Sequence, residues 1–113
     1  MKLITFAAAF EAITGLILIA VPSWLAWLLL GSHLAAVGDA VGRVAGIALL
    51  ALGLSRSVQG LLSYNVLVAI FLLYLGIRGE LVGVLLWPAF AAHGVLSVLL
   101  ARLAYAPDVS KTT

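Results

Sequence analysis

The sequence contains no cysteine and very little charge. Among its 113 residues, six are Lys or Arg and four are Asp or Glu, so 9% of the chain is charged. The lack of cysteine excludes disulfides, thiolate nucleophiles and Cys-bound zinc or iron–sulfur sites. Soluble domains carry about 25% charged residues. Because too few polar side chains exist here to cover a water-exposed surface, we expect the chain to be surrounded by lipid.

Apolar residues, by contrast, make up 65% of the chain, and its mean hydropathy is +1.30. A helix needs about 20 residues to cross the hydrocarbon core, so four spans would take about 80 residues. Little then remains for a catalytic domain outside the membrane. We therefore expect an all-α integral membrane protein, one four-helix bundle, that is not an enzyme. The spans are predicted at about residues 3–21, 36–54, 61–77 and 81–104.

Two prolines and two tryptophans refine this division. Pro22 ends the first span, and the apolar segment after it carries Trp24 and Trp27, which is typical of a short helix lying at the membrane–water interface. Pro88 lies within the fourth predicted span and is expected to bend it. The first apolar run continues past a charged residue without a polar break, so we expect a retained span and not a signal peptide.

The basic residues predict an orientation. Four spans place both termini and the middle turn on one side of the membrane. That side collects Lys2, Arg56, Arg102 and Lys111, whereas the other turn has Arg78 alone. By the positive-inside rule, both termini face the cytoplasm. A three-span alternative would leave one hydrophobic stretch unused. The net charge of +2 gives no support to nucleic-acid binding.

Small residues in the second span predict close helix packing. Gly38, Gly42 and Gly46 are four residues apart and form one smooth stripe against which another helix can lie. The first span offers Ala8, Ala12 and Gly15. Because the bundle is small and has such a face, we expect a homo-oligomer or a subunit of a larger membrane complex, with membrane lipids as further partners.

Ionisable residues inside the spans are the candidates for function. Glu11 lies about 12 Å below the inner surface, at 1.5 Å per residue. A lone carboxylate at that depth must be protonated, paired or exposed to a wet cavity. Arg43 has two possible partners, Glu11 and Asp39, which is one turn earlier on the same face. We favour Glu11, because Arg43 lies beside the glycine stripe that should face other helices.

A polar pocket inside the bundle is the predicted site. His93 lies at nearly the depth of Glu11, and other polar or aromatic residues accompany it. Such residues also bridge helices without any ligand, so a purely structural role stays open. A lone His is a poor haem site, and the sequence has no cluster suited to a metal, so we expect no cofactor other than a quinone or a lipid. The predicted pocket residues are Glu11, Arg43, His93, Tyr64, Asn65 and Trp87.

Several short motifs resemble the small bacterial DoxX-like proteins, in particular their uncharacterised short branch. They are FEAITG at 10–15, LLG at 29–31, GRVAG at 42–46 and LGL at 52–54. The resemblance implies a four-helix protein of the bacterial inner membrane, with the family's membrane Glu and Arg at Glu11 and Arg43. It also implies that a few relatives serve as membrane subunits in thiosulfate-to-quinone electron transfer.

Two functions follow from these observations. We expect an accessory or scaffolding protein, or one that binds a lipophile such as a quinone or lipid in the polar pocket. The alternative is a small proton-coupled transporter of hydrophobic compounds that uses Glu11. Small multidrug-resistance transporters are of similar size and hold a membrane Glu in their first span. An ion pair with Arg43 would neutralise that carboxylate, which argues against transport.

Overall fold

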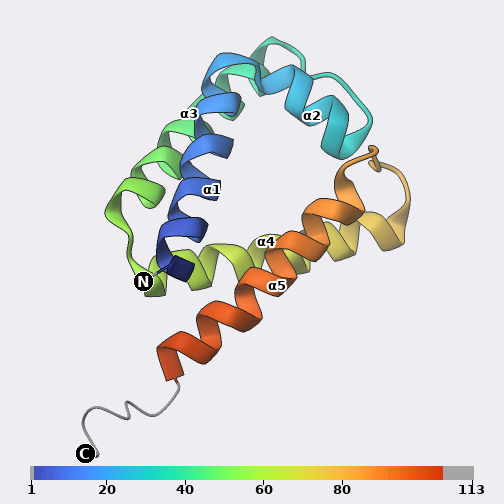
Figure 1. Cartoon of the computed structure of the whole chain (residues 1–113). Coiled ribbons are helices and arrows are strands. Elements are labelled where there is room, and N and C mark those ends of the chain that lie inside the picture. Colours follow the sequence, from blue (N-terminus) through green and yellow to red (C-terminus); the bar gives the residue numbers. More distant parts are fainter. Residues whose placement is uncertain (1, 106–113) are drawn as a thin grey trace, which may run out of the picture.

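The computed structural model describes residues 2–105, and the regular secondary structure of this part of the chain is all helix (Figure 1). Lys111, counted above in the charge bias, lies outside the described residues. The helices are α1 (Lys2–Ala20), α2 (Pro22–Leu30), α3 (Ala36–Ser55), α4 (Val58–Arg78) and α5 (Leu86–Tyr105). The predicted all-α class, the four long helices and the short helix after the first of them are confirmed.

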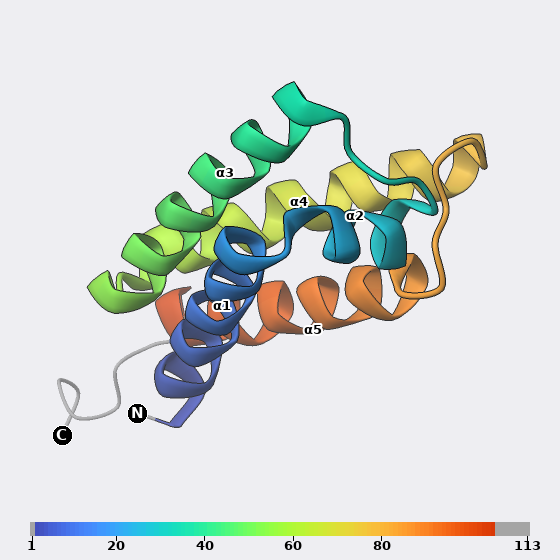
Figure 2. The same cartoon turned by 90° about the horizontal axis from the view of Figure 1, so that it is seen from above.

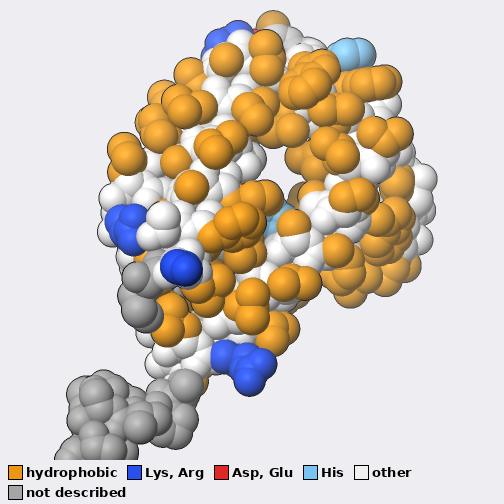
Figure 3. All heavy atoms as spheres, in the orientation of Figure 1, with side chains coloured by type: hydrophobic (Ala, Val, Ile, Leu, Met, Phe, Trp, Pro, Cys, Tyr) orange, Lys and Arg blue, Asp and Glu red, His pale blue; other side chains and the backbone are white. Residues whose placement is uncertain are grey.

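The four long helices have the length and composition of membrane spans. They contain 19 to 21 residues each and are apolar on nearly every side. Large apolar side chains on the surface outnumber those in the buried core, and Figure 3 shows apolar side chains over most of the visible face. A surface of this kind suits lipid and not water, as expected of a multi-pass membrane protein.

Prolines and glycines set the helix ends. Pro22 is the first residue of α2, where its missing N–H costs no intrahelical hydrogen bond. Gly31 and Gly79 follow α2 and α4 with positive φ angles of 77° and 76°, the left-handed conformation that ends many helices. At the start of α4, the Ser57 hydroxyl accepts a hydrogen bond from the Gly60 N–H at 3.1 Å.

The fourth span begins later than predicted. Residues 79–85 form a loop, so α5 begins at Leu86 and not near residue 81. Pro88 therefore lies in the first turn of α5, where no earlier helical carbonyl exists for it to disturb. The predicted bend at Pro88 is thus wrong, and the proline marks the beginning of the helix.

Helices α1 and α3 form a tight antiparallel hairpin. A Cβ atom added at Gly46 would lie 2.6 Å from the Gly15 carbonyl oxygen, and one added at Gly53 would lie 2.5 Å from that of Ala8. Such distances mean that the two backbones approach as closely as glycine allows. Ala12 also packs here, with its Cβ 2.9 Å from the added atom at Gly53.

The predicted glycine stripe is only partly correct. Gly46 lies in the contact with α1, but Gly42 lies against Pro22 of α2, and Gly38 lies against Leu34 just before its own helix. The second close contact with α1 comes from Gly53, seven residues after Gly46. Two turns of helix separate these glycines, so both face α1, whereas a strict four-residue step drifts around the helix.

Helices α4 and α5 form the second antiparallel hairpin, and the two hairpins meet at two places (Figures 1 and 2). The first place is a buried apolar cluster near the beginning of α1. The second is a clasp at the far end, where the loop before α5 donates backbone hydrogen bonds to the end of α2. In the clasp, Gly83 N–H bonds to Leu29 at 2.9 Å and Leu85 N–H bonds to Leu28 at 2.8 Å. The buried cluster contains Ala7, Ala8, Leu61, Leu62, Leu96 and Leu100.

The close α1–α3 contact predicts that the same glycine-to-alanine substitution has different effects on stability at two positions. Gly53→Ala places a methyl group against the backbone of α1, so it should destabilise the fold by about 1–3 kcal/mol. Gly94→Ala on α5 is the matched control, because nothing lies within 4 Å of an added Cβ there. It should be neutral or stabilising by up to about 1 kcal/mol, from helix propensity. Thermal unfolding in detergent measures both, and equal effects would contradict the close contact.

Candidate functional site

An apolar cavity lies between the two hairpins. It has a volume of about 290 Å³ and is bounded by α1, α2 and α5. Figure 3 shows the opening, rimmed by apolar side chains. The cavity lies between the two places where the hairpins meet, the buried cluster and the clasp, and the Phe10–His93 contact forms part of its wall. Its lining residues are Phe10, Thr14, Leu25, Leu29, Leu85, Pro88, Ala89, Ala92 and His93.

His93 supplies the principal polar side chain of this cavity wall. The residue is buried, and its Nδ1 lies 2.7 Å from the Asn65 Oδ1 on α4. Two aromatic rings stand edge-on to the imidazole, with ring centroids at 5.6 Å for Phe10 and 5.8 Å for Tyr64. The imidazole is therefore held in one orientation by neighbours from two other helices, α1 and α4.

The hydrogen bonds of Asn65 determine which nitrogen of His93 carries the proton. Asn65 Nδ2 donates to the Leu61 carbonyl at 2.8 Å. A carbonyl can only accept, so this bond fixes the amide and leaves Oδ1 as the acceptor toward His93. His93 Nδ1 therefore donates. In the neutral imidazole the other nitrogen, Nε2, is then a hydrogen-bond acceptor, and no bond to it forms within residues 2–105.

Glu11 lies behind this pair, inside the protein. Its side chain is fully buried, and neither carboxyl oxygen has a hydrogen-bond partner among residues 2–105. It lies close to Asn65 and Tyr64 without a hydrogen bond to either. A buried polar group without partners is costly and usually has a functional reason. Glu11 does not line the cavity. Asn65 lies close to it and connects it to His93, which does line the cavity.

The structure thus brings four of the predicted pocket residues together. Glu11, Asn65 and His93 are buried, and Tyr64 is half-buried beside them. They come from α1, α4 and α5. Phe10, whose ring contacts His93 and lines the cavity, is a wall residue that sequence reasoning missed. The sequence offered no signal for it, because an apolar ring in an apolar span does not stand out.

Arg43 is not part of the pocket, and the favoured Glu11–Arg43 pair is wrong. Arg43 Nε lies 3.3 Å from Asp39 Oδ2, and its Nη1 donates to the Ile19 carbonyl at the end of α1. The side chain is 48% exposed. Since Glu11 precedes Ile19 by eight residues, it lies about 12 Å away along α1. Arg43 instead satisfies a terminal carbonyl of α1, which has no partner within its own helix.

Trp87 also lies outside the pocket. Its ring stands edge-on to Phe90 at 5.8 Å and is 45% exposed. It packs over Gly76 of α4, where an added Cβ would lie 2.5 Å from the indole ring. Trp87 therefore joins the ends of α4 and α5, and its place at the start of α5 follows from the later beginning of that helix.

The interfacial segment carries a second, smaller group of polar contacts. Ser23 Oγ accepts from the Leu34 N–H at 3.0 Å and lies 3.2 Å from His33 Nδ1. The His33 ring stacks on Trp27, with centroids 6.1 Å apart. Trp24 and Trp27 are both partly exposed, as residues at a membrane interface are. These contacts fix the connection from α2 to α3.

No family model, curated protein or solved structure matches this chain.

The charge arrangement can be tested with two double-mutant cycles. Asp39→Asn and Arg43→Gln should show a coupling of about 0.2–1 kcal/mol, the usual range for a partly exposed ion pair. Glu11→Gln and Arg43→Gln should add within about 0.5 kcal/mol, because the two residues share no contact. The unfolding free energy in mixed micelles measures both cycles. Coupling confined to the Glu11 cycle would overturn the assignment of Arg43 to Asp39.

Proposed function

We propose that this small multi-pass membrane protein binds a lipophile whose polar head hydrogen-bonds to His93, with a quinol as the best-fitting class. The observation that supports this proposal is the His93 imidazole on the cavity wall. Asn65 fixes it so that its free nitrogen, Nε2, accepts a hydrogen bond. Ligand sites are typically apolar hollows with a few oriented polar groups. The apolar lining suits a ring or tail, and Nε2 suits a hydroxyl donor.

Glu11 completes the proposal as a positioning residue. Its buried carboxyl group interacts with Asn65, which in turn orients His93. The DoxX-like resemblance and the distribution of basic residues favour a bacterial inner-membrane protein whose termini face the cytoplasm. Glu11 lies in the first of its four spans. A reporter fused to the C-terminus would check the orientation. In this proposal the chain is an accessory subunit or a homo-oligomer, and not an enzyme.

The proposal predicts selective binding of the hydroxyl form. Decylubiquinol should bind more tightly than decylubiquinone, because only the quinol donates to Nε2. His93→Leu should weaken quinol binding about twofold to twelvefold, which corresponds to the loss of one hydrogen bond of about 0.5–1.5 kcal/mol. Anaerobic calorimetric titration of the detergent-solubilised protein measures both affinities.

Ser97→Ala is the matched control for this titration. Ser97 lies one turn after His93 on the same helix and donates to the His93 carbonyl at 2.7 Å, but it does not line the cavity. Its substitution should leave quinol affinity unchanged. Equal affinity for the two redox forms, with no effect of His93→Leu, would show that His93 is only a packing residue.

Proton-coupled transport is the second candidate, and one observation favours it. Because Arg43 pairs with Asp39, no cation in the described part of the chain neutralises the Glu11 carboxyl group, as a proton-coupled carboxyl group requires. In proteoliposomes with a pH gradient, a transporter should move a hydrophobic cation such as ethidium and should lose this with Glu11→Gln. A quinol binder should show no such flux in either protein.

A further inference from the structure

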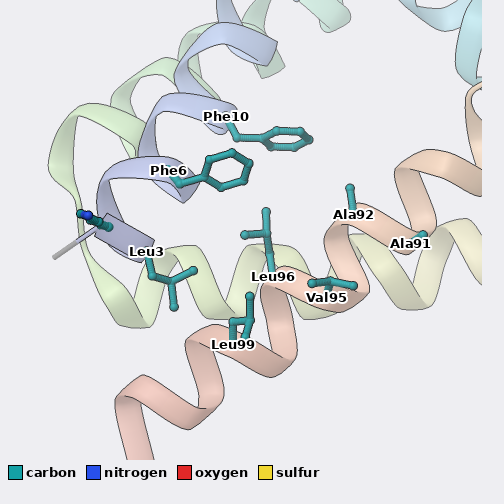
Figure 4. A pocket seen from close by; sticks show the side chains of 9 residues that line it. Leu3, Phe6, Phe10, Ala91, Ala92, Val95, Leu96 and Leu99 are labelled. Carbon is teal, nitrogen blue, oxygen red and sulfur yellow. The ribbon is translucent and has the colours of Figure 1, made fainter.

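A second, larger groove lies on the outside of the protein between α1 and α5 (Figure 4). Its volume is about 590 Å³, within the roughly 300–1,000 Å³ range of ligand sites. From α1, Leu3, Phe6 and Phe10 point toward α5, and from α5, Ala92, Val95 and Leu99 face them across the gap. The groove is distinct from the His93 cavity, although Phe10 and Ala92 contribute to both.

The groove walls are apolar, and aromatic contacts hold one wall in place. Phe6 and Phe10 stack with ring centroids 6.4 Å apart, so they form one continuous surface on α1. The edge of Phe10 is fixed against His93. Lys2 is the charged residue of the lining and lies where α1 begins. The groove is therefore preformed and apolar, and it has a cation at one end.

The charge distribution indicates the sign of the occupant. Arg102 lies one turn beyond Leu99 on the same face of α5, so it extends the basic end of the groove. Among residues 2–105, the acidic side chains lie elsewhere: Glu11 is buried, Asp39 is paired with Arg43 and Glu80 is paired with Arg78. An anionic headgroup would thus meet two cations and no competing carboxylate of the described chain.

The length of the groove indicates the rest of the occupant. From Lys2 to Phe10 the chain rises about 12 Å, at 1.5 Å per residue. Half of a bilayer's hydrocarbon core is about 15 Å thick. A groove that begins at a cation and ends about 12 Å deeper matches an acyl chain in one leaflet, with its headgroup at the membrane surface.

We propose that the α1–α5 groove is a binding site for an anionic phospholipid, with one acyl chain along Phe6 and Phe10 and the phosphate group between Lys2 and Arg102. The proposal does not rest on quinol binding, since it uses other side chains and another face of α1. Lipid in this groove would lie over the Phe10 ring that separates it from His93.

Competition between two lipids tests this site. The full-length protein in detergent is mixed with equal amounts of phosphatidylglycerol and phosphatidylethanolamine that carry the same acyl chains, and retained lipid is read by native mass spectrometry. Phosphatidylglycerol should be preferred. Lys2→Gln and Arg102→Gln should each lower its retention about fivefold, the factor expected for one basic residue near an anionic headgroup.

Two control variants distinguish lipid binding in the groove from attraction of lipid to the basic end of the protein as a whole. Arg56→Gln removes the same charge at the same end, but Arg56 donates to Thr5 on another side of α1 at 2.7 Å, away from the groove. It should change retention less than twofold. Val95→Trp fills the groove at an exposed position and should reduce retention of both lipids.

Three results would overturn the proposal. Equal retention of the two lipids would remove the role of charge. Equal losses with Arg56→Gln and Lys2→Gln would show a diffuse basic surface. A lipid-free dimer that dissociates with Val95→Trp would show that a second copy of the chain occupies the groove.

Discussion

The close approach of α1 and α3 determines how every other part of α1 is used. Ala8, Ala12 and Gly15 face α3, and the backbone contact at Gly46 and Gly53 leaves no room to rotate that face. Ala7 and Glu11, one step around the helix, are therefore turned toward the second hairpin. Burial of Glu11 thus follows from packing that does not involve Glu11 itself. This explains why an isolated carboxyl group is held inside an apolar protein.

Much of this architecture was predictable, since run length and hydropathy report on membrane spans directly. The interfacial helix was also predictable, because a proline followed by tryptophans specifies it. The position of Pro88 was not, because a proline in an apolar run is compatible with a kink or with a helix start. The partner of Arg43 depended on where α3 begins relative to α1. A shift of about two turns in that register would bring Arg43 to the level of Glu11, and side-chain spacing within one helix contains no information on it.

The candidate site was predicted at the level of its members and not of its arrangement. Depth alone placed Glu11 and His93 at one level, and the structure adds Asn65 as the link between them. Phe10 escaped notice, because a phenylalanine in a membrane span carries no distinctive signal. Yet its ring forms a shared wall of the cavity and the groove. The cavity on one side of this ring offers the His93 imidazole, and the groove on the other side offers an apolar wall and a cation. The two hollows can consequently bind different molecules.

The clasp between α2 and the loop before α5 has a consequence for sequence change. Its hydrogen bonds run from backbone to backbone, so most side chains there are interchangeable as long as the chain path is kept. The exceptions are Gly31, which has a positive φ, and Gly83, where an added Cβ would lie 2.2 Å from the Leu28 carbonyl oxygen. At this end, two glycines and backbone peptide groups thus join the halves of the molecule, which the buried cluster joins at the other end. Many different sequences can therefore form the clasp, and divergent chains can retain it with almost no sequence identity.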